Sequence, residues 1–368
     1  MVAEKPKRKM AAKKPKDPNV VTTTLRYRIK DASRLALLDQ LARSVNLVWN
    51  YCNETSFHAV RNHSKWLSEF DLQALTTGTG KELGISSVTV QSICKEFVTR
   101  RIQFKKRKLR WRVSQGSKRS LGWIPFKANS IQVKGERVTY LGHEFRIWLS
   151  RPIKGRILSG SFSQDAQGRW YVNLACEISK VENKHHVEDV GIDLGLKTSA
   201  VLSDGTKIDN SAEYRKLEEK LGKAQRANKK KQVKKVHAKI KNKRRDYLHK
   251  ETTKIARKYH TVFVGDVSGK FVQSGNGKSS TDASIGVIRD LLKYKAIKHS
   301  GYCFEVSENS STVTCSVCHK KTGPSGLSGL GVREWSCSEC RAHHDRDINA
   351  ARNILRFGRE SLRATKVA

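Results

Sequence analysis

Two pairs of closely spaced cysteines near the C-terminus constrain the fold more than any other feature of this 368-residue sequence. Two residues separate the members of each pair and 18 residues separate the pairs, which are Cys315, Cys318, Cys337 and Cys340. Each pair can place two thiolates on one tight turn, and two such turns complete a tetrahedral zinc site. Because these four ligands fill the shell, we predict one structural Zn²⁺ in a zinc ribbon, with His343 and His344 outside the shell.

The charge of the chain indicates a polyanionic partner. Lys and Arg number 73 against 34 Asp and Glu, which gives a net charge of +39. A solvated surface usually mixes both signs, whereas acidic residues are scarce here, so nucleic acid is the expected partner. A small-molecule substrate would not require this excess, and we expect none.

The sequence contains no recognisable membrane or export signal. It lacks a run of about 18 apolar residues, so we expect no membrane span. The N-terminal segment is basic but lacks the apolar core of a secretory signal. The remaining cysteines are scattered, as is typical of reduced thiols. We therefore expect a protein of a reducing compartment, the cytoplasm.

The pattern of hydrophobicity predicts a β-rich N-terminal half. Residues 1–19 are expected to form a disordered basic arm. Short alternating segments in 20–32 and 110–182 predict the strands of a β-barrel. Apolar residues at helical spacing in 33–109 predict a helical domain inserted near the start of this barrel. The predicted core of its first helix is Leu38, Leu41, Val45, Val48 and Trp49.

The C-terminal half alternates strands and helices, which predicts an α/β domain. We assign residues 183–308 and 341–358 to this domain, 309–340 to the zinc ribbon and 359–368 to a tail. The segment 212–260 is helical and extremely basic, so contact with phosphates is expected. The basic residues predicted to contact nucleic acid are Lys105, Lys106, Arg107, Lys229, Lys230, Lys231, Lys234, Lys235, Lys243, Arg244 and Arg245.

Two aspartates are candidate Mg²⁺ ligands. Asp193 ends an apolar strand and points away from its apolar face, although an exposed strand residue is the alternative. Helical spacing places Asp347 on the face of Ala350 and Ala351, whereas Asp345 faces outward or caps the helix. A carboxylate on a packed face needs a partner, and a metal ion is a natural one. Two Mg²⁺ held by three or four carboxylates can hydrolyse a phosphodiester.

Several segments together resemble the TnpB family of transposon-encoded nucleases, formerly called OrfB-type transposases and related to type V CRISPR effectors and Fanzor proteins. These segments are GIDLGLK, LSDG, TCSVC, REWSCSEC and HDRDINAARNIL, with NLVWNYCNE near the N-terminus. The resemblance spans about residues 20–358. It implies an RNase H-like RuvC domain with an inserted zinc ribbon, and an N-terminal wedge barrel interrupted by a helical recognition domain. It also implies guide-RNA-directed cleavage of double-stranded DNA beside a short adjacent motif, with the RNA derived from the transposon end.

By this resemblance Asp193 is the first RuvC carboxylate and Asp347 is the last. The middle position departs from the family pattern, in which an apolar strand ends in Glu-Asp-Leu. The aligned residues here are Gly265, Asp266 and Val267, and glycine cannot bind a metal.

Three hypotheses follow for the missing carboxylate. Asp266 could substitute, but it lies one residue out of register, so its side chain should project to the opposite face of the strand. Glu308, seven residues before the first zinc cysteine, could supply it, as in rearranged relatives. The site could also be inactive. We favour Glu308, with Asp266 capping the turn that follows its strand.

The functional prediction is an RNA-guided DNA endonuclease with two catalytic Mg²⁺ held by Asp193, Glu308 and Asp347. The alternative is a nuclease-dead RNA-guided repressor that binds DNA. A transposase acting by its own strand transfer is a weaker alternative, since no tyrosine or serine nucleophile module is evident. Sequence specificity would come from base pairing with the guide.

Overall fold

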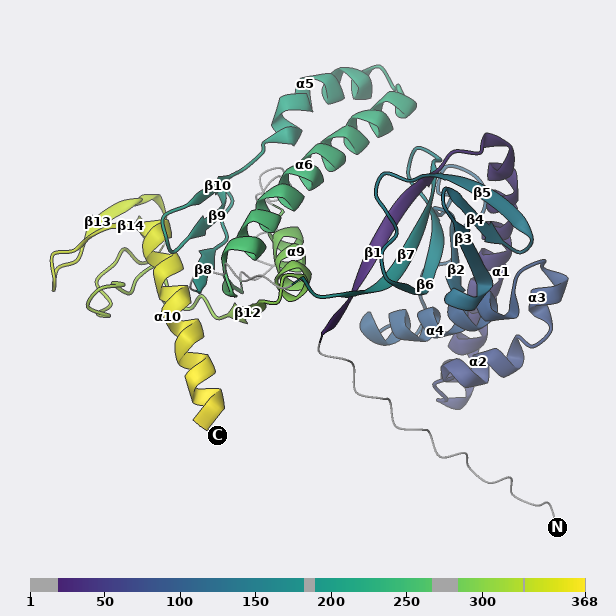
Figure 1. The fold of residues 1–368 in the computed structure, drawn as a ribbon, viewed down its shortest axis with the longest axis horizontal. Coiled ribbons are helices and arrows are strands. Elements are labelled where there is room, and N and C mark those ends of the chain that lie inside the picture. The colour runs from purple at the N-terminus through teal and green to yellow at the C-terminus, as the bar shows by residue number, and fades with distance from the viewer. Residues whose placement is uncertain (1–18, 182–188, 267–283, 327, 368) are drawn as a thin grey trace, which may run out of the picture.

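The computed structural model describes residues 19–181, 189–266, 284–326 and 328–367, which form two parts joined near helix α9 (Figure 1). The N-terminal part is a barrel with helices packed against it, and the C-terminal part is a sheet covered by helices on both faces. No helix among the described residues is long and apolar enough to cross a membrane.

The N-terminal barrel is a seven-stranded antiparallel sheet, nearly closed, with the strand order β2-β6-β7-β1-β5-β4-β3. The strands are β1 (Val20–Ile29), β2 (Trp123–Lys127), β3 (Ile131–Lys134), β4 (Arg137–Tyr140), β5 (His143–Trp148), β6 (Arg156–Gln164) and β7 (Trp170–Ser179). Alternate residues of β7 are buried, as expected of a strand with one face on a core. The rings of Phe126, Tyr140, Phe145 and Phe162 pack together inside the barrel. The predicted barrel is thus confirmed.

Between β1 and β2 the chain forms a helical insertion. Its helices are α1 (Leu35–His63), α2 (Glu69–Leu75), α3 (Thr79–Glu82) and α4 (Ser87–Gln103). The five residues predicted as the core of the first helix are all buried in α1. The side chains of Ser68 and Asp71 form a capping box that starts α2. The insertion shares one apolar core with the barrel.

The C-terminal part is built on a five-stranded sheet in the order β10-β9-β8-β11-β12. Its strands are β8 (Val190–Asp193), β9 (Thr198–Leu202), β10 (Lys207–Asp209), β11 (Thr261–Gly265) and β12 (Tyr302–Val306). Neighbours among β10, β9 and β8 are antiparallel, whereas β8, β11 and β12 are parallel. The chain turns between β8 and β9.

Helices cover both faces of this sheet. On one face, α6 (Lys230–Lys258) and α9 (Ile285–Lys298) pack against Val190, Ile192, Val262 and Val264. Helix α5 (Glu213–Arg226) pairs with α6 to form a hairpin that projects from the sheet (Figure 1). On the other face, α10 (Arg346–Val367) packs against β8 and Phe263. The short strands β13 (Glu334–Ser336) and β14 (His343–Asp345) precede α10.

Candidate metal centre and carboxylate site

The parallel strands of the C-terminal sheet end side by side. Val264 lies beside Ile192, so the next residues, Gly265 on β11 and Asp193 on β8, are neighbours. Gly265 also pairs with Val306, the last residue of β12, and Glu308 follows two residues later. The carboxyl ends of parallel strands are where α/β folds gather functional side chains. Three strand ends therefore bring Asp193, Gly265 and Glu308 to one edge of the sheet.

The side chain of Glu308 lies over Gly265. A Cβ added at Gly265 would collide with Oε1 of Glu308 and would lie 2.6 Å from its Cγ and Cδ. Gly265 is buried, and any side chain at this position would compete with Glu308 for the same space. The glycine is thus the residue that allows a carboxylate from the segment after β12 to reach the end of β11.

Helix α10 brings Asp347 to the same edge. A Cβ at Gly191 would collide with the carbonyl of Ala351 and would lie 2.6 Å from the backbone nitrogen of Leu355, so helix and strand are in backbone contact. Ala350 and Ala351 are fully buried in this contact. Asp345 accepts hydrogen bonds from the N–H groups of Asp347 and Ile348 and caps the helix, as one of the sequence alternatives proposed.

The three carboxylates interact electrostatically. Burial, with the negative charges of Glu308 and Asp347 added, raises the pKa of Asp193 to about 8. Arg346 and Arg333 oppose this rise. Desolvation and neighbouring like charges both favour the protonated carboxyl, so the site concentrates negative charge where little water can disperse it.

An arginine from the zinc-ribbon segment contacts this site. Nη1 of Arg333 lies 3.3 Å from Oδ1 of Asp347, and Arg346 donates from its backbone N–H to the carbonyl of Arg333. The guanidinium of Arg346 donates to the carbonyl of Gly329 at 2.7 Å. These two arginines could not be predicted from the sequence, since their proximity depends on the fold of the ribbon loop.

Asp266 and Glu305 do not join the cluster. Asp266 is exposed, and its Oδ1 accepts the backbone N–H of Glu308 at 3.2 Å. The turn that Asp266 was predicted to cap, at residues 268–270, lies outside the described residues. Glu305 is exposed on β12 and pairs with Lys293 of α9 at 3.0 Å. Asp266 therefore positions the backbone that carries Glu308.

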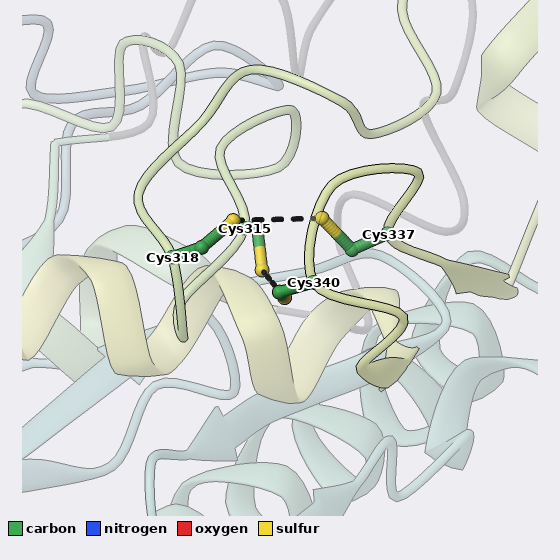
Figure 2. Close-up of side chains that lie close together, drawn as sticks. All are labelled: Cys315, Cys318, Cys337 and Cys340. Carbon is green, nitrogen blue, oxygen red and sulfur yellow. Dashed lines mark hydrogen bonds between the residues drawn. The ribbon is translucent and has the colours of Figure 1, made fainter.

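The four cysteines of the paired motif converge, as Figure 2 shows. Their sulfur atoms all lie within 4.8 Å of one another, with 3.6 Å between Cys315 and Cys340 and 3.5 Å between Cys318 and Cys337. Zn–S bonds of about 2.3 Å in tetrahedral geometry separate the sulfurs by about 3.8 Å. The cluster therefore fits one structural zinc ion.

Two equivalent turns hold these cysteines. In each pair the N–H of the residue after the second cysteine donates to the carbonyl of the first, and this residue, His319 or Arg341, has a positive φ near 60°. Nε2 of His344 lies 3.1 Å from Sγ of Cys315, and its ring packs on Trp335. His344 thus contacts one of the predicted ligands.

Two asparagines fasten the first cysteine turn to α10. Oδ1 of Asn349 accepts the N–H of Ser316 at 2.8 Å, and its Nδ2 donates to the carbonyl of Thr314. Nδ2 of Asn353 donates to the carbonyls of Ser311 and Thr314. Both asparagines are buried one turn apart, and that i, i+4 spacing of amides beside the motif was the available sequence signal. Helix α10 therefore holds both the cysteine cluster and Asp347 in place.

The predicted nucleic-acid contacts occupy exposed surfaces. Lys105, Lys106 and Arg107 follow α4 and are exposed. The other predicted basic residues lie on the α5–α6 hairpin, where a groove of about 710 Å³ is lined by Lys220, Lys229, Lys230, Lys231, Lys235 and Lys239. Lys243 contacts Glu213 at 3.4 Å, and Arg244 is half-buried, so these two are less available than the rest.

Comparison with known proteins supplies related sequences and a related fold. Residues 173–270 match the family OrfB_IS605, described as a probable transposase, and residues 286–354 match the Cas12f1-like TNB domain. A candidate RNA-guided DNA endonuclease of Streptomyces pristinaespiralis is 37% identical over 212 residues, covering 53% of this chain and 52% of that protein. A second one, InsQ of Escherichia coli K12, is 28% identical over 244 residues, covering 58% of this chain and 60% of that protein. The chain thus spans little more than half the length of these relatives.

A solved structure has a similar fold across most of the chain. It is the cryo-EM structure of a Cas12f1–sgRNA–target DNA complex, with a TM-score of 0.59 and 12% sequence identity. The match covers 91% of this chain and 99% of that one. At this identity the similarity concerns the fold alone.

Proposed function

We propose that this chain is a member of the TnpB family and an RNA-guided DNA endonuclease that cleaves target DNA beside a short adjacent motif. The observation that carries this proposal is the convergence of Asp193, Glu308 and Asp347 at the ends of β8, β12 and the start of α10. A chain that only bound DNA would have no need to gather acidic side chains against their own repulsion.

The C-terminal part supports an RNase H-like RuvC domain. Three antiparallel strands are followed by two parallel ones, and the carboxylates lie where the parallel strands end. The similar sequences named as candidate RNA-guided DNA endonucleases support a nuclease domain in this part. The zinc ribbon would be an insertion whose cysteine turns are fastened to α10 by Asn349 and Asn353.

The carboxylate cluster would hold two Mg²⁺ ions. Its donors are hard oxygens, which Mg²⁺ prefers, and added positive charge would oppose the rise in the pKa of Asp193. Asp193 would be shared between the ions, with Glu308 and Asp347 holding one each. When bound, Mg²⁺ would stabilise the charge that develops on the phosphodiester and lower the pKa of the attacking water.

The protein's own residues position the carboxylates and the substrate phosphate. The backbone contact at Gly191 fixes the distance between Asp193 and Asp347, and the space over Gly265 receives Glu308. Arg333 and Arg346 place positive charge beside the carboxylates, where they can attract the scissile phosphate. Hydrolysis would leave a 3′-hydroxyl and a 5′-phosphate.

Recognition would be divided between the protein and its guide RNA. The basic hairpin and the segment Lys105–Arg107 would hold RNA and DNA by their phosphates, while base pairing selects the target. Zinc would be structural, since the four cysteines leave no ligand position for a substrate.

Plasmid cleavage by the purified ribonucleoprotein in Mg²⁺ tests the proposal. The wild type should cut a plasmid that carries the matching sequence, and Asp193→Ala should bind the guide RNA without cutting. Asp246→Asn, which alters an exposed ion pair with Lys250 on α6, is the matched control and should cut normally. Target binding without cutting by the wild type would instead establish a nuclease-dead RNA-guided repressor, and joined rather than cut ends would indicate strand transfer.

A further inference from the structure

Two buried thiols meet in the core of the helical insertion. Cys52 lies on α1 and Cys94 lies on α4, 42 positions later, and their sulfur atoms are 3.8 Å apart. Both side chains are fully buried. Cys176 of β7 is equally buried, but its thiol donates to the carbonyl of Leu174. Cys52 and Cys94 therefore form a second group of cysteines, separate from the four cysteines of the ribbon.

Other contacts between α1 and α4 hold the two helices together beside this pair. The ring of Trp49 packs edge-on against the ring of Phe97, with their centroids 5.5 Å apart. The guanidinium of Arg101 donates to the hydroxyl of Ser56. Because the S–S bond of a disulfide is about 2.05 Å long, its formation requires the two sulfur atoms to approach by less than about 2 Å. Rotation of the two cysteine side chains can supply this movement while the helices keep their other contacts.

The two thiols differ in how readily they ionise. The hydrogen bond with Cys52 lowers the pKa of Cys94, although burial opposes this shift. The same hydrogen bond, together with burial, raises the pKa of Cys52. The thiolate is the nucleophile in thiol oxidation, so Cys94 is suited to attack an oxidant and Cys52, which stays protonated, is suited to react second.

A short helical segment covers Cys94. The hydroxyl of Thr76, the residue that ends α2, lies 3.6 Å from Sγ of Cys94. Helix α2 has seven residues and α3 has four. Helices this short depend on tertiary contacts, and such segments open locally at a lower free energy than the core. Local opening at Thr76 would admit a small oxidant to the pair while the barrel stays folded.

We propose that Cys52 and Cys94 are a redox-sensitive pair, which hydrogen peroxide converts to a disulfide that fastens α1 to α4. The thiolate of Cys94 attacks one oxygen of the peroxide, so that the S–O bond of a sulfenic acid forms, the O–O bond breaks, and the departing hydroxide takes up the proton that Cys94 released. The sulfur of Cys52 then attacks the sulfenic sulfur, and the second hydroxide leaves as water with the proton of Cys52. The two thiols together lose two hydrogen atoms, and the peroxide is reduced to two waters. Small thiols of a reducing cytoplasm would restore the pair by thiol–disulfide exchange.

Peptide mapping of the full-length, zinc-loaded protein tests the proposal. The protein is treated with hydrogen peroxide at concentrations that leave its zinc content unchanged, alkylated in denaturant, and digested with trypsin without reductant. The tryptic peptides 44–61 and 82–95, which contain Cys52 and Cys94, should be joined, and dithiothreitol should separate them. Cys176 should be alkylated to the same extent with and without peroxide. Free thiols at Cys52 and Cys94 after the treatment, or a bridge from either to another cysteine, would overturn the proposal.

Thermal unfolding provides the second measurement. The bridge joins residues 42 positions apart, so oxidation should raise the Tm of the wild type by about 5–10 °C, and dithiothreitol should reverse the rise. Peroxide should not raise the Tm of Cys52→Ala or Cys94→Ala, whereas Cys176→Ala, which also removes a buried thiol, should respond as the wild type does.

Each protein is compared with its own reduced form, so a variant that is destabilised by the lost sulfur still gives a clear result. A bridged wild type with an unchanged or lower Tm would show that the disulfide does not fasten α1 to α4, and would overturn the proposal. Neither measurement involves DNA or RNA, so the outcome is independent of the proposed nuclease activity.

Discussion

Glu308 places its carboxylate in the space that a side chain at Gly265 would occupy. Gly265 ends β11, and Glu308 follows β12, the parallel neighbour of β11, 43 positions later in the sequence. A carboxylate at the end of β11 and one arriving from beyond β12 are therefore mutually exclusive. This relationship explains how the chain can keep three acidic groups together although its β11 strand ends in glycine.

Exchanging the two positions should move the carboxylate without losing it. Glu308→Ala should abolish DNA cleavage, and Gly265→Glu alone should be poorly folded because the new side chain collides with Glu308. The double variant Gly265→Glu/Glu308→Ala removes the collision and should regain at least about tenfold activity over Glu308→Ala, equivalent to about 1.4 kcal/mol. Cleavage rates at saturating guide RNA would show this. A well-folded double variant no more active than Glu308→Ala would count against the equivalence of the positions.

The raised pKa of Asp193 predicts a pH-dependent stability in Mg²⁺-free buffer. The folded state holds the proton up to about pH 8, whereas the unfolded chain releases it near the ordinary value of 3.8. Between these values the folded state binds more protons, so this group lowers stability as pH rises. Asp193→Asn should therefore be more stable than the wild type at pH 8, by on the order of 2 kcal/mol, with the difference shrinking toward pH 4.

Tm measured from pH 4 to pH 8.5 for wild type, Asp193→Asn and the control Asp246→Asn would check this dependence. Saturating Mg²⁺ should reduce the difference at pH 8, because the ions neutralise the cluster. If Tm depended on pH in the same way for all three proteins, burial and the neighbouring carboxylates would not raise the pKa of Asp193.

Metal analysis should give one zinc per chain. Cys337→Ser should lose the zinc and, because Asn349 and Asn353 fasten the ribbon to α10, should also reduce cleavage. Cys303→Ser, which alters a half-buried cysteine outside the cluster, should retain it. His344→Ala should keep zinc but bind it about tenfold more weakly, because His344 supports Cys315 without being one of the four ligands. A zinc-free wild type would refute the site.

The contact between β8 and α10 predicts opposite effects for two glycine substitutions. Gly191→Ala should destabilise the protein by about 1–3 kcal/mol, because the added methyl group meets helix backbone that cannot move aside. Gly286→Ala, in α9 with nothing within 4 Å of the new Cβ, should be neutral or stabilise by up to about 1 kcal/mol. Chemical denaturation measures both. Equal changes in the free energy of unfolding for the two variants would show that α10 does not pack against the backbone at Gly191.

Features set by local periodicity or spacing could be predicted from the sequence. The buried face of α1 follows the 3.6-residue period, and the convergence of the four cysteines follows from their two short intervals. The different orientations of Asp345 and Asp347 follow from their positions at the start of a helix. The TnpB resemblance rests on the same short motifs, and the family matches confirm it.

Features that depend on long-range register could not be predicted with the same certainty. Glu308 was one of three hypotheses, because only the parallel pairing of β11 with β12 shows that its side chain reaches Gly265. The contact between Arg333 and Asp347 depends on the course of the ribbon loop, and the contact between Cys52 and Cys94 depends on how α1 packs against α4. The hydrogen bond from Glu308 to Asp266 also joins residues that the sequence keeps 42 positions apart.

The most direct test of the account is DNA cleavage by Glu308→Gln compared with Asp266→Asn, each as purified ribonucleoprotein in Mg²⁺. Glu308→Gln keeps the size of the side chain but removes the charge, and it should slow cleavage by about 10³-fold, equivalent to about 4 kcal/mol. Asp266→Asn retains an acceptor for the N–H of Glu308 and should remain within about tenfold of the wild type. An active Glu308→Gln beside an inactive Asp266→Asn would contradict the assignment of Glu308 to the site.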